Sequence, residues 1–91
     1  KVYLDEILVV ESLQDYLKIF TTTERFIIHQ TLSSFTDDLP KDKFIRIHRS
    51  FTISIDKVDS IEGNSVQIDG VRYVIGRTYI DKVKKIITST K

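Results

Sequence analysis

Short β-branched runs separated by tight turns constrain the fold of this chain most. Residues 7–10 (ILVV), 16–21 (YLKIFT) and 25–29 (RFIIH) have the composition of strands, and the polar stretches 12–15 and 22–24 between them are typical of turns. We therefore expect a meander of short antiparallel strands in the first third of the chain, with its first strand buried on both faces.

The apolar spacing changes in the middle of the chain. Leu32, Phe35 and Leu39 stand at positions i, i+3 and i+7, which lie on one face of a helix. Thr31 is a suitable N-cap just before them, and Pro40 stops the helix near Leu39. The sequence thus predicts a helix of about two turns within a β-rich chain.

Strand composition returns after this helix. Alternation along residues 44–49 predicts a strand with Phe44, Arg46 and His48 on one face and the intervening residues, Arg49 among them, on the other. A further β run follows directly, at residues 51–55.

Two hairpins and a closing helix are predicted for the last third. Residues 62–64 (EGN) form a turn signal, and Asp69-Gly70 is a type I′ hairpin signal before the strand at residues 71–74, which Gly76 ends. Residues 78–87 are expected to form a helix. Its core face comprises Ile80, Val83 and Ile87, and Thr78 with Asp81 forms its capping box.

Composition excludes several classes of protein. The chain has 91 residues, of which 41% are hydrophobic and 30% charged, so we assign residues 1–91 to one domain with one core. No apolar run approaches the roughly 20 residues that a membrane span needs. Without cysteine there is no disulfide framework and no sulfur-ligated metal site, which suits a cytoplasmic location. We expect no cofactor, and we interpret the absence of an initial methionine as the mark of a fragment.

The net charge of +1 conceals an uneven distribution. Residues 1–40 hold three basic and seven acidic side chains, a net charge of −4, whereas residues 41–91 hold eleven and six, a net charge of +5. A basic half of this kind suits a surface that binds a polyanion. A dipolar surface without a function explains the distribution equally well.

The residue types needed for catalysis occur without the needed arrangement. Ser50 lies two residues from His48, but a third, orienting group is missing. The paired carboxylates at residues 5–6 and 37–38 stand at element boundaries, and the glycines are spaced as turn residues. We therefore do not expect an enzyme.

Residues 41–50 offer better material for nucleic-acid binding. They concentrate four basic side chains and one histidine. A guanidinium at a strand edge can bind phosphate or read guanine in the major groove, and we favour this interpretation for Arg49. Lys41 and Lys43 are interpreted more simply as residues that solvate a strand. Composition alone indicates no more than a β-rich domain with a basic side.

Several sequence motifs occur in the same order as in one known family of domains. Residues 44–51 (FIRIHRSF) resemble the central F-x-R-x-H-R-S signature of LytTR DNA-binding domains. Residues 5–12, 15–19, 31–40 and 74–79 resemble, in the same order, the family's opening block, its D-Y-V-x-I strand, its T-L…L-P helix and its terminal I-P-V-S-R-x-Y block. The resemblance covers nearly the whole chain.

This resemblance implies a fold and a function. The fold would be mainly β, an elongated stack of small, mostly antiparallel sheets with two short helices. Loop side chains would enter successive major grooves of double-stranded DNA, unlike the single helix of helix-turn-helix proteins. The domain would be the output module of a bacterial two-component response regulator, joined to an N-terminal receiver domain. It would bind imperfect direct repeats in promoters as a dimer and bend the DNA.

Three loop regions would supply the DNA contacts of such a domain. The first lies around Tyr16, Leu17 and Lys18, the second is Arg49, and the third is Arg77. Arg49 and Arg77 match family positions that contact bases, and arginine suits both guanine and phosphate. Phosphate contacts would come from Lys18 and Lys43, and from either Lys82 or Lys85 on the last helix.

Some of these positions have two interpretations. In the triplet His48-Arg49-Ser50, the histidine either orients the loop through a backbone hydrogen bond or contacts DNA. Arg46 is equally well interpreted as a structural ion-pair partner. Gly76 replaces a small polar residue of the family, and Thr78 offers a substitute hydroxyl. The alternative for the whole domain is a protein-interaction or sensor module that uses exposed strand edges.

Overall fold

The structure, a computed structural model, describes residues 2–90 and consists of eight strands and two α-helices in that range. The first half contains β1 (Ile7–Leu13), β2 (Tyr16–Thr21), β3 (Arg25–Ile28), α1 (Leu32–Asp37) and β4 (Phe44–His48). The second half contains β5 (Phe51–Ser54), β6 (Ser60–Glu62), β7 (Ser65–Ile68), β8 (Val71–Val74) and α2 (Ile80–Thr90). Short 3-10 turns lie at Leu4–Glu6 and Ile55–Lys57.

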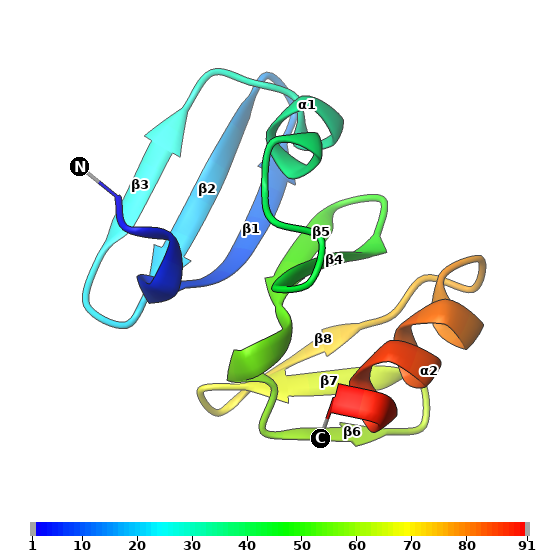
Figure 1. The fold of residues 1–91 in the computed structure, drawn as a ribbon. Coiled ribbons are helices and arrows are strands. Elements are labelled where there is room, and N and C mark those ends of the chain that lie inside the picture. The colour runs from blue at the N-terminus through cyan, green and yellow to red at the C-terminus, as the bar shows by residue number, and fades with distance from the viewer. Residues whose placement is uncertain (1, 91) are drawn as a thin grey trace.

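The strands form two antiparallel sheets, as Figure 1 shows. The larger sheet has the order β3-β2-β1-β5-β4, and the smaller one has the order β6-β7-β8. This confirms the predicted mainly β class with small antiparallel sheets and two helices. The extents of 31 × 25 × 22 Å make the domain only mildly elongated.

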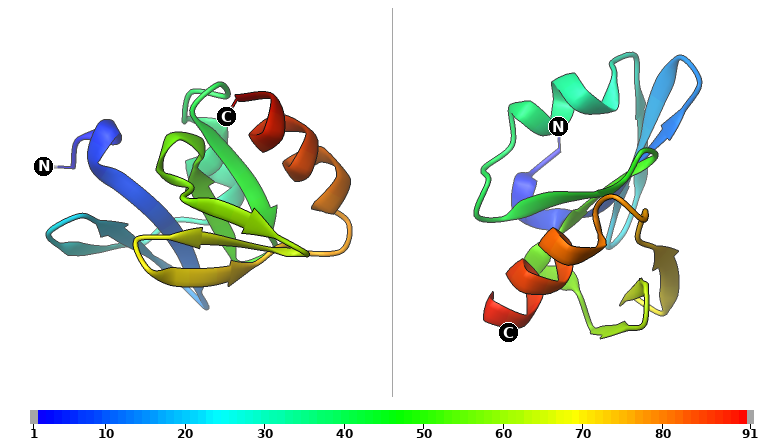
Figure 2. Two further views of the ribbon diagram at one scale, coloured as in Figure 1. Left: turned by 90° about the horizontal axis from the view of Figure 1, so that it is seen from below. Right: turned by 90° about the vertical axis from the view of Figure 1, so that its right-hand side faces the viewer.

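Two hydrophobic clusters cover the two faces of the larger sheet. One cluster joins this sheet to α2 and the smaller sheet, and the other joins it to α1. Figure 2 shows the two helices on either side of the β4–β5 hairpin. The predicted burial of the first strand on both faces is therefore confirmed, because Ile7 and Val10 lie in the α1 cluster while Leu8 and Val9 lie in the α2 cluster. A β-bulge between Ile7 and Val9 breaks the simple alternation, so that the adjacent side chains of Leu8 and Val9 both lie on the α2 side.

The hairpin turns follow their sequence signals. Asp69 and Gly70 have φ of 51° and 80°, so both adopt the left-handed conformation that a type I′ turn requires. The β1–β2 turn has no glycine, and here Gln14 adopts the left-handed conformation with a φ of 46°. Residues 14–15 alone form this turn, and the preceding Ser12 and Leu13 belong to β1.

Helix α1 agrees with its prediction except at its end. The Thr31 hydroxyl accepts a hydrogen bond from the backbone N–H of Ser34 at 3.1 Å, as expected of an N-cap. The helix ends at Asp37 rather than near Leu39. Its last turn tightens, because the N–H of Leu39 donates to the carbonyl of Thr36, three residues back.

Two further predicted boundaries are wrong. Strand β4 ends at His48, so Arg49 lies in a turn and not on a strand face; the register of β4 against β5 shifts between Arg46 and His48. Helix α2 begins at Ile80, which places Thr78 ahead of the N-cap position and removes it from the predicted capping box. No helix within residues 2–90 combines the length and apolar character of a membrane span.

Candidate nucleic-acid interface

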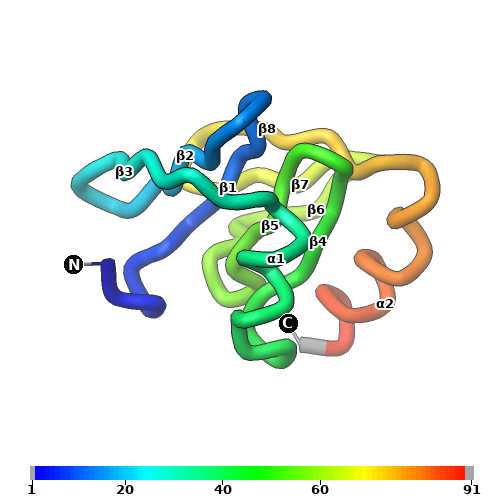
Figure 3. Tube along the Cα trace, turned by 90° about the horizontal axis from the view of Figure 1, so that it is seen from above, coloured from blue at the N-terminus to red at the C-terminus, as the bar shows by residue number. Residues whose placement is uncertain are grey.

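Several connections between strands meet at one edge of the molecule. The N–H of Ser12, beside the β1–β2 turn, donates to the carbonyl of Ser50 in the β4–β5 turn at 2.8 Å. The N–H of Gly76, in the β8–α2 loop, donates to the carbonyl of Ile47 at 2.7 Å, and the same loop bonds to Asn64 in the β6–β7 turn. Figure 3 shows the β1–β2 turn, the β4–β5 turn and the β8–α2 loop following one another along the border of the domain. We call residues 14–15, 49–50, 63–64 and 75–79 the loop edge.

The β4–β5 turn presents Arg49 from a braced backbone. Arg49 is exposed, and the turn contains only Arg49 and Ser50. The N–H of Ser50 donates to Nδ1 of His48 at 3.0 Å, which is the backbone contact expected of an orienting histidine. The His48 ring also packs against Phe51, with centroids 5.4 Å apart. Because the backbone of this two-residue turn is held in place, the Arg49 side chain can change its rotamer while its Cα stays fixed.

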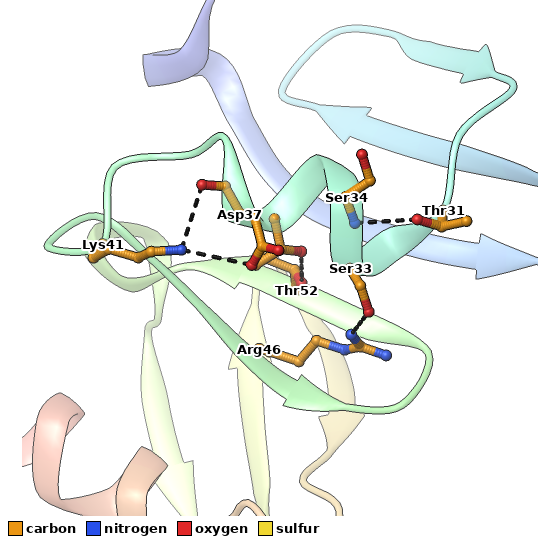
Figure 4. Close-up of polar contacts among 8 residues, drawn as sticks. Thr31, Ser33, Ser34, Asp37, Lys41, Arg46 and Thr52 are labelled. Carbon is orange, nitrogen blue, oxygen red and sulfur yellow. Dashed lines mark hydrogen bonds and ion pairs between the residues drawn. The ribbon is translucent and has the colours of Figure 1, made fainter.

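Arg46 lies beneath the same turn, and within residues 2–90 it does not form the ion pair that was one interpretation of it. Its guanidinium donates to the backbone carbonyls of His48 and Arg49 and to the hydroxyl of Ser33. These partners are neutral oxygens, so Arg46 bridges the turn and α1. Figure 4 shows the bond to Ser33 of α1.

The β8–α2 loop brings a second exposed arginine to the edge. Arg77 and Thr78 are exposed, and a shallow depression between Arg77, His48 and Asn64 joins this loop to its neighbours. Gly76 lies in a tight place, because a Cβ there would be 3.0 Å from Cδ2 of Tyr79 and 3.6 Å from Cα of His48. A side chain at residue 76 would therefore require the Tyr79 ring to shift.

The first predicted contact region is corrected in part. Leu17 is fully buried in the α1 cluster and is not available to a ligand. Tyr16 is half-buried directly after the turn, with its ring 6.2 Å from that of His29. Lys18 lies within the sheet, opposite Glu11 and Ile27, with its Nζ 5.9 Å from the centroid of the Phe20 ring.

The exposed side chains at the first turn are ones that sequence reasoning treated only as turn residues. A second shallow depression is lined by Gln14, Asp15, Gln30 and Arg49, so it connects the β1–β2 turn to the β4–β5 turn. Amide side chains such as those of Gln14, Gln30 and Asn64 can pair with adenine in the major groove. Gln14 and Asn64 were predicted only as turn residues, which says nothing of the ligand, and Gln30 was not singled out in the sequence.

Not all predicted basic residues gather at the loop edge. Lys43 precedes β4 and so lies at the opposite end of that strand from Arg49, where its Nζ is 3.8 Å from a carboxylate oxygen of Asp56. Lys82 and Lys85 are exposed on α2, with Lys82 the nearer in sequence to the Arg77 loop. The structure thus brings together His48, Arg49, Ser50 and Arg77, with Tyr16 alongside, and leaves Lys43 apart.

A β-rich scaffold that presents two exposed guanidinium groups from adjoining short loops has the form of a domain that binds a polyanion through its loops. The comparison with known families agrees. The chain matches the model of the LytTr DNA-binding domain over residues 1–88, and it belongs to that family of DNA-binding domains.

Individual relatives are similar at moderate identity. The sensory transduction protein LytT of Bacillus anthracis is 27% identical over 92 residues, covering 94% of this chain and 37% of that protein. LytT of Bacillus subtilis is 27% identical over 78 residues, covering 79% of this chain and 32% of that protein. The chain therefore spans about a third of the length of these curated relatives.

A solved structure confirms the fold. The LytTr DNA-binding domain of a putative methyl-accepting/DNA response regulator from Bacillus cereus superimposes with a TM-score of 0.85 at 23% sequence identity. The match covers 94% of this chain and 84% of that one. At this identity the likeness concerns the arrangement of strands and helices.

Proposed function

We propose that the domain reads double-stranded DNA sequence-specifically with the loop edge, as the output module of a two-component transcription regulator. One observation carries this proposal. Arg49 and Arg77 are exposed on loops whose backbones are tied to the same strand, through the turn after His48 and through the bond from Gly76 to Ile47. The backbone positions from which the two side chains extend are thereby held close to each other.

The chemistry of direct readout fits these two side chains. A guanidinium donates two parallel hydrogen bonds to O6 and N7 of guanine in the major groove. Because Nδ1 of His48 is engaged by the Ser50 amide, only Nε2 of that ring is left to face DNA. The Ser50 hydroxyl and Tyr16 would contact the phosphate backbone beside the bases.

The lysines would act at longer range. Lys18 and the α2 lysines would attract phosphates that flank the groove, and Lys43 would do so only if the duplex backbone bends round to the far end of β4. The effect of substituting Lys43 on affinity therefore indicates how far the DNA extends over the domain.

The rest of the regulator is inferred from the relatives. They are sensory transduction proteins of nearly three times the length matched here, which leaves room for the receiver domain that we propose on the N-terminal side. Such a protein would bind imperfect direct repeats in promoters as a dimer, with each domain on one repeat.

The test begins with selection of bound sequences from a random pool of duplexes. Affinity of the domain for the enriched duplex and for a scrambled one is then measured by fluorescence anisotropy across a salt series. We expect tight binding to the enriched duplex only, with log affinity falling linearly with log salt by about 0.9 per phosphate contact. Failure to enrich any duplex would instead favour a protein-interaction module.

Two arginine variants locate the interface. Arg49→Ala and Arg77→Ala should each weaken binding to the enriched duplex by about 1–3 kcal/mol and relax specificity. Lys41→Ala is the charge-matched control, since Lys41 is exposed at the far end of the domain. If both arginine variants bind both duplexes as the parent does, the assignment of the loop edge is wrong.

A further inference from the structure

The guanidinium of Arg46 uses all three of its nitrogens inside the protein. Nε donates to the carbonyl of His48 at 3.0 Å, and Nη2 donates to the carbonyl of Arg49 at 2.7 Å. Nη1 donates to the hydroxyl of Ser33, in α1, at 2.9 Å. Successive carbonyls at the start of the β4–β5 turn are thus bound by one rigid, planar group.

These contacts fall at the place where β4 departs from regular pairing. The register against β5 shifts between Arg46 and His48, so the backbone there lacks the full ladder of strand hydrogen bonds. The carbonyls of His48 and Arg49 point to the guanidinium instead. The hydrogen bonds from Arg46, together with the bond from the Ser50 N–H to His48, therefore hold the peptide that carries the Arg49 side chain.

The same side chain ties the turn to α1. Figure 4 shows Arg46 bonded to Ser33 in the first turn of α1, and Thr52 on the neighbouring strand bonded to the following turn of the same helix. Thr52 is opposite Arg46 in the β4–β5 register, is fully buried, and shares a hydrogen bond of 2.7 Å with Thr36 of α1. A helix of six residues is not stable alone, so its position depends on such tertiary contacts.

We propose that Arg46 is a positioning residue for DNA readout, which holds Arg49 in the direction that the major groove requires and does not itself touch DNA. This inference rests on the proposed function. The geometry favours positioning over contact because each of the three guanidinium nitrogens already donates a hydrogen bond to a protein oxygen.

A double-mutant cycle tests the inference, using the enriched and scrambled duplexes described above. Arg46→Ala should weaken binding to the enriched duplex on the order of tenfold and lower its preference over the scrambled one. The slope of log affinity against log salt should stay at the parental value, because no phosphate contact is lost. Arg46→Ala combined with Arg49→Ala should bind no more weakly than Arg49→Ala alone.

Two further variants separate positioning from folding and from charge. Arg46→Lys keeps the charge but cannot bridge three oxygens in one plane, so it should lose specificity nearly as Arg46→Ala does. Ser33→Ala removes only the tie to α1 and should have a smaller effect. Circular dichroism and the melting temperature of each variant establish that the fold is intact. If Arg46→Ala does not fold, the cycle is measured with Arg46→Lys.

The outcomes are distinguishable. Additive losses in the cycle, or a shallower salt slope for Arg46→Ala, would mean that Arg46 contacts DNA and would overturn the proposal. Full parental binding by Arg46→Lys would also overturn it, since charge alone would then suffice. If Arg49→Ala itself binds as the parent does, the proposed function of the loop edge fails, whatever Arg46 does.

Discussion

Gly76 shows how one missing side chain lets two loops approach each other. Its N–H donates to Ile47, and a Cβ would meet the Tyr79 ring at 3.0 Å. We expect Gly76→Ala to destabilise the domain by about 1–3 kcal/mol, as overpacking does, and to weaken DNA binding by displacing Arg77. Thermal melting and anisotropy measure the two effects. Thr78→Ala, an exposed neighbour, is the control and should change stability by less than about 0.5 kcal/mol.

Tyr73 gives the domain a dependence on alkaline pH. Burial raises the pKa of its phenol above 10.0, and the negative charges of Glu11 and Asp69 raise this pKa further. The unfolded chain therefore loses this proton first as pH rises. The stabilisation is fully present below pH 10 and is lost as pH rises through the folded-state pKa.

Denaturant unfolding at a series of pH values checks this account of Tyr73. The parent should lose stability progressively above pH 10, and Tyr73→Phe should flatten that decline. The ring packs edge-on against Phe51, and phenylalanine preserves that contact, so the two proteins should be similar at neutral pH. An equally steep alkaline decline in Tyr73→Phe would contradict the assignment.

Among the elements, α1 depends most visibly on its cap. It has six residues, and the Thr31 hydroxyl binds the Ser34 amide at 3.1 Å. Thr31→Ala should lower the free energy of unfolding by about 1 kcal/mol, and Thr31→Ser, which keeps the hydroxyl, should restore most of it. Chemical denaturation measures both. Equal loss in the two variants would show that the hydroxyl does not cap the helix.

Element types were predictable because periodicity and turn residues are local signals. The positive φ of Asp69 and Gly70 and the cap at Thr31 follow directly from residue chemistry. The bulge beside Leu8 and the end of β4 before Arg49 were not predictable, because both depend on which strand pairs with which. Leu17 was assigned to a DNA-contacting loop by the family resemblance, although it belongs to the predicted strand 16–21 and its side chain lies in the core.

At the scale of the whole molecule, sheet order creates the candidate site. Strand β5 lies between β1 and β4, and this arrangement brings residues 14–15 and 49–50 to the same border. Neither the composition of the chain nor its net charge contains that information. The family resemblance supplied Arg49 and Arg77 in advance, whereas Gln14, Gln30 and Asn64 emerge only from the fold.

The charge asymmetry between the two halves of the sequence does not map onto one face. The basic half supplies Arg49 and Arg77 at the loop edge, but it also supplies Lys41 and Lys43 at the far end of β4. There the two lysines approach Asp37 and Asp56 at 3.8 Å. Attraction of the duplex to the loop edge must therefore arise from local positive charge and not from a uniformly basic surface.

The central claim is that DNA binds along the loop edge, and an NMR titration of the isotope-labelled domain with the enriched duplex tests it most directly. Amide shifts should move strongly at residues 14–15, 49–50, 63–64 and 76–78, with little change around Lys43 and Asp56. Large shifts confined to the Lys43 end, with the Arg49 and Arg77 amides unmoved, would contradict the claim.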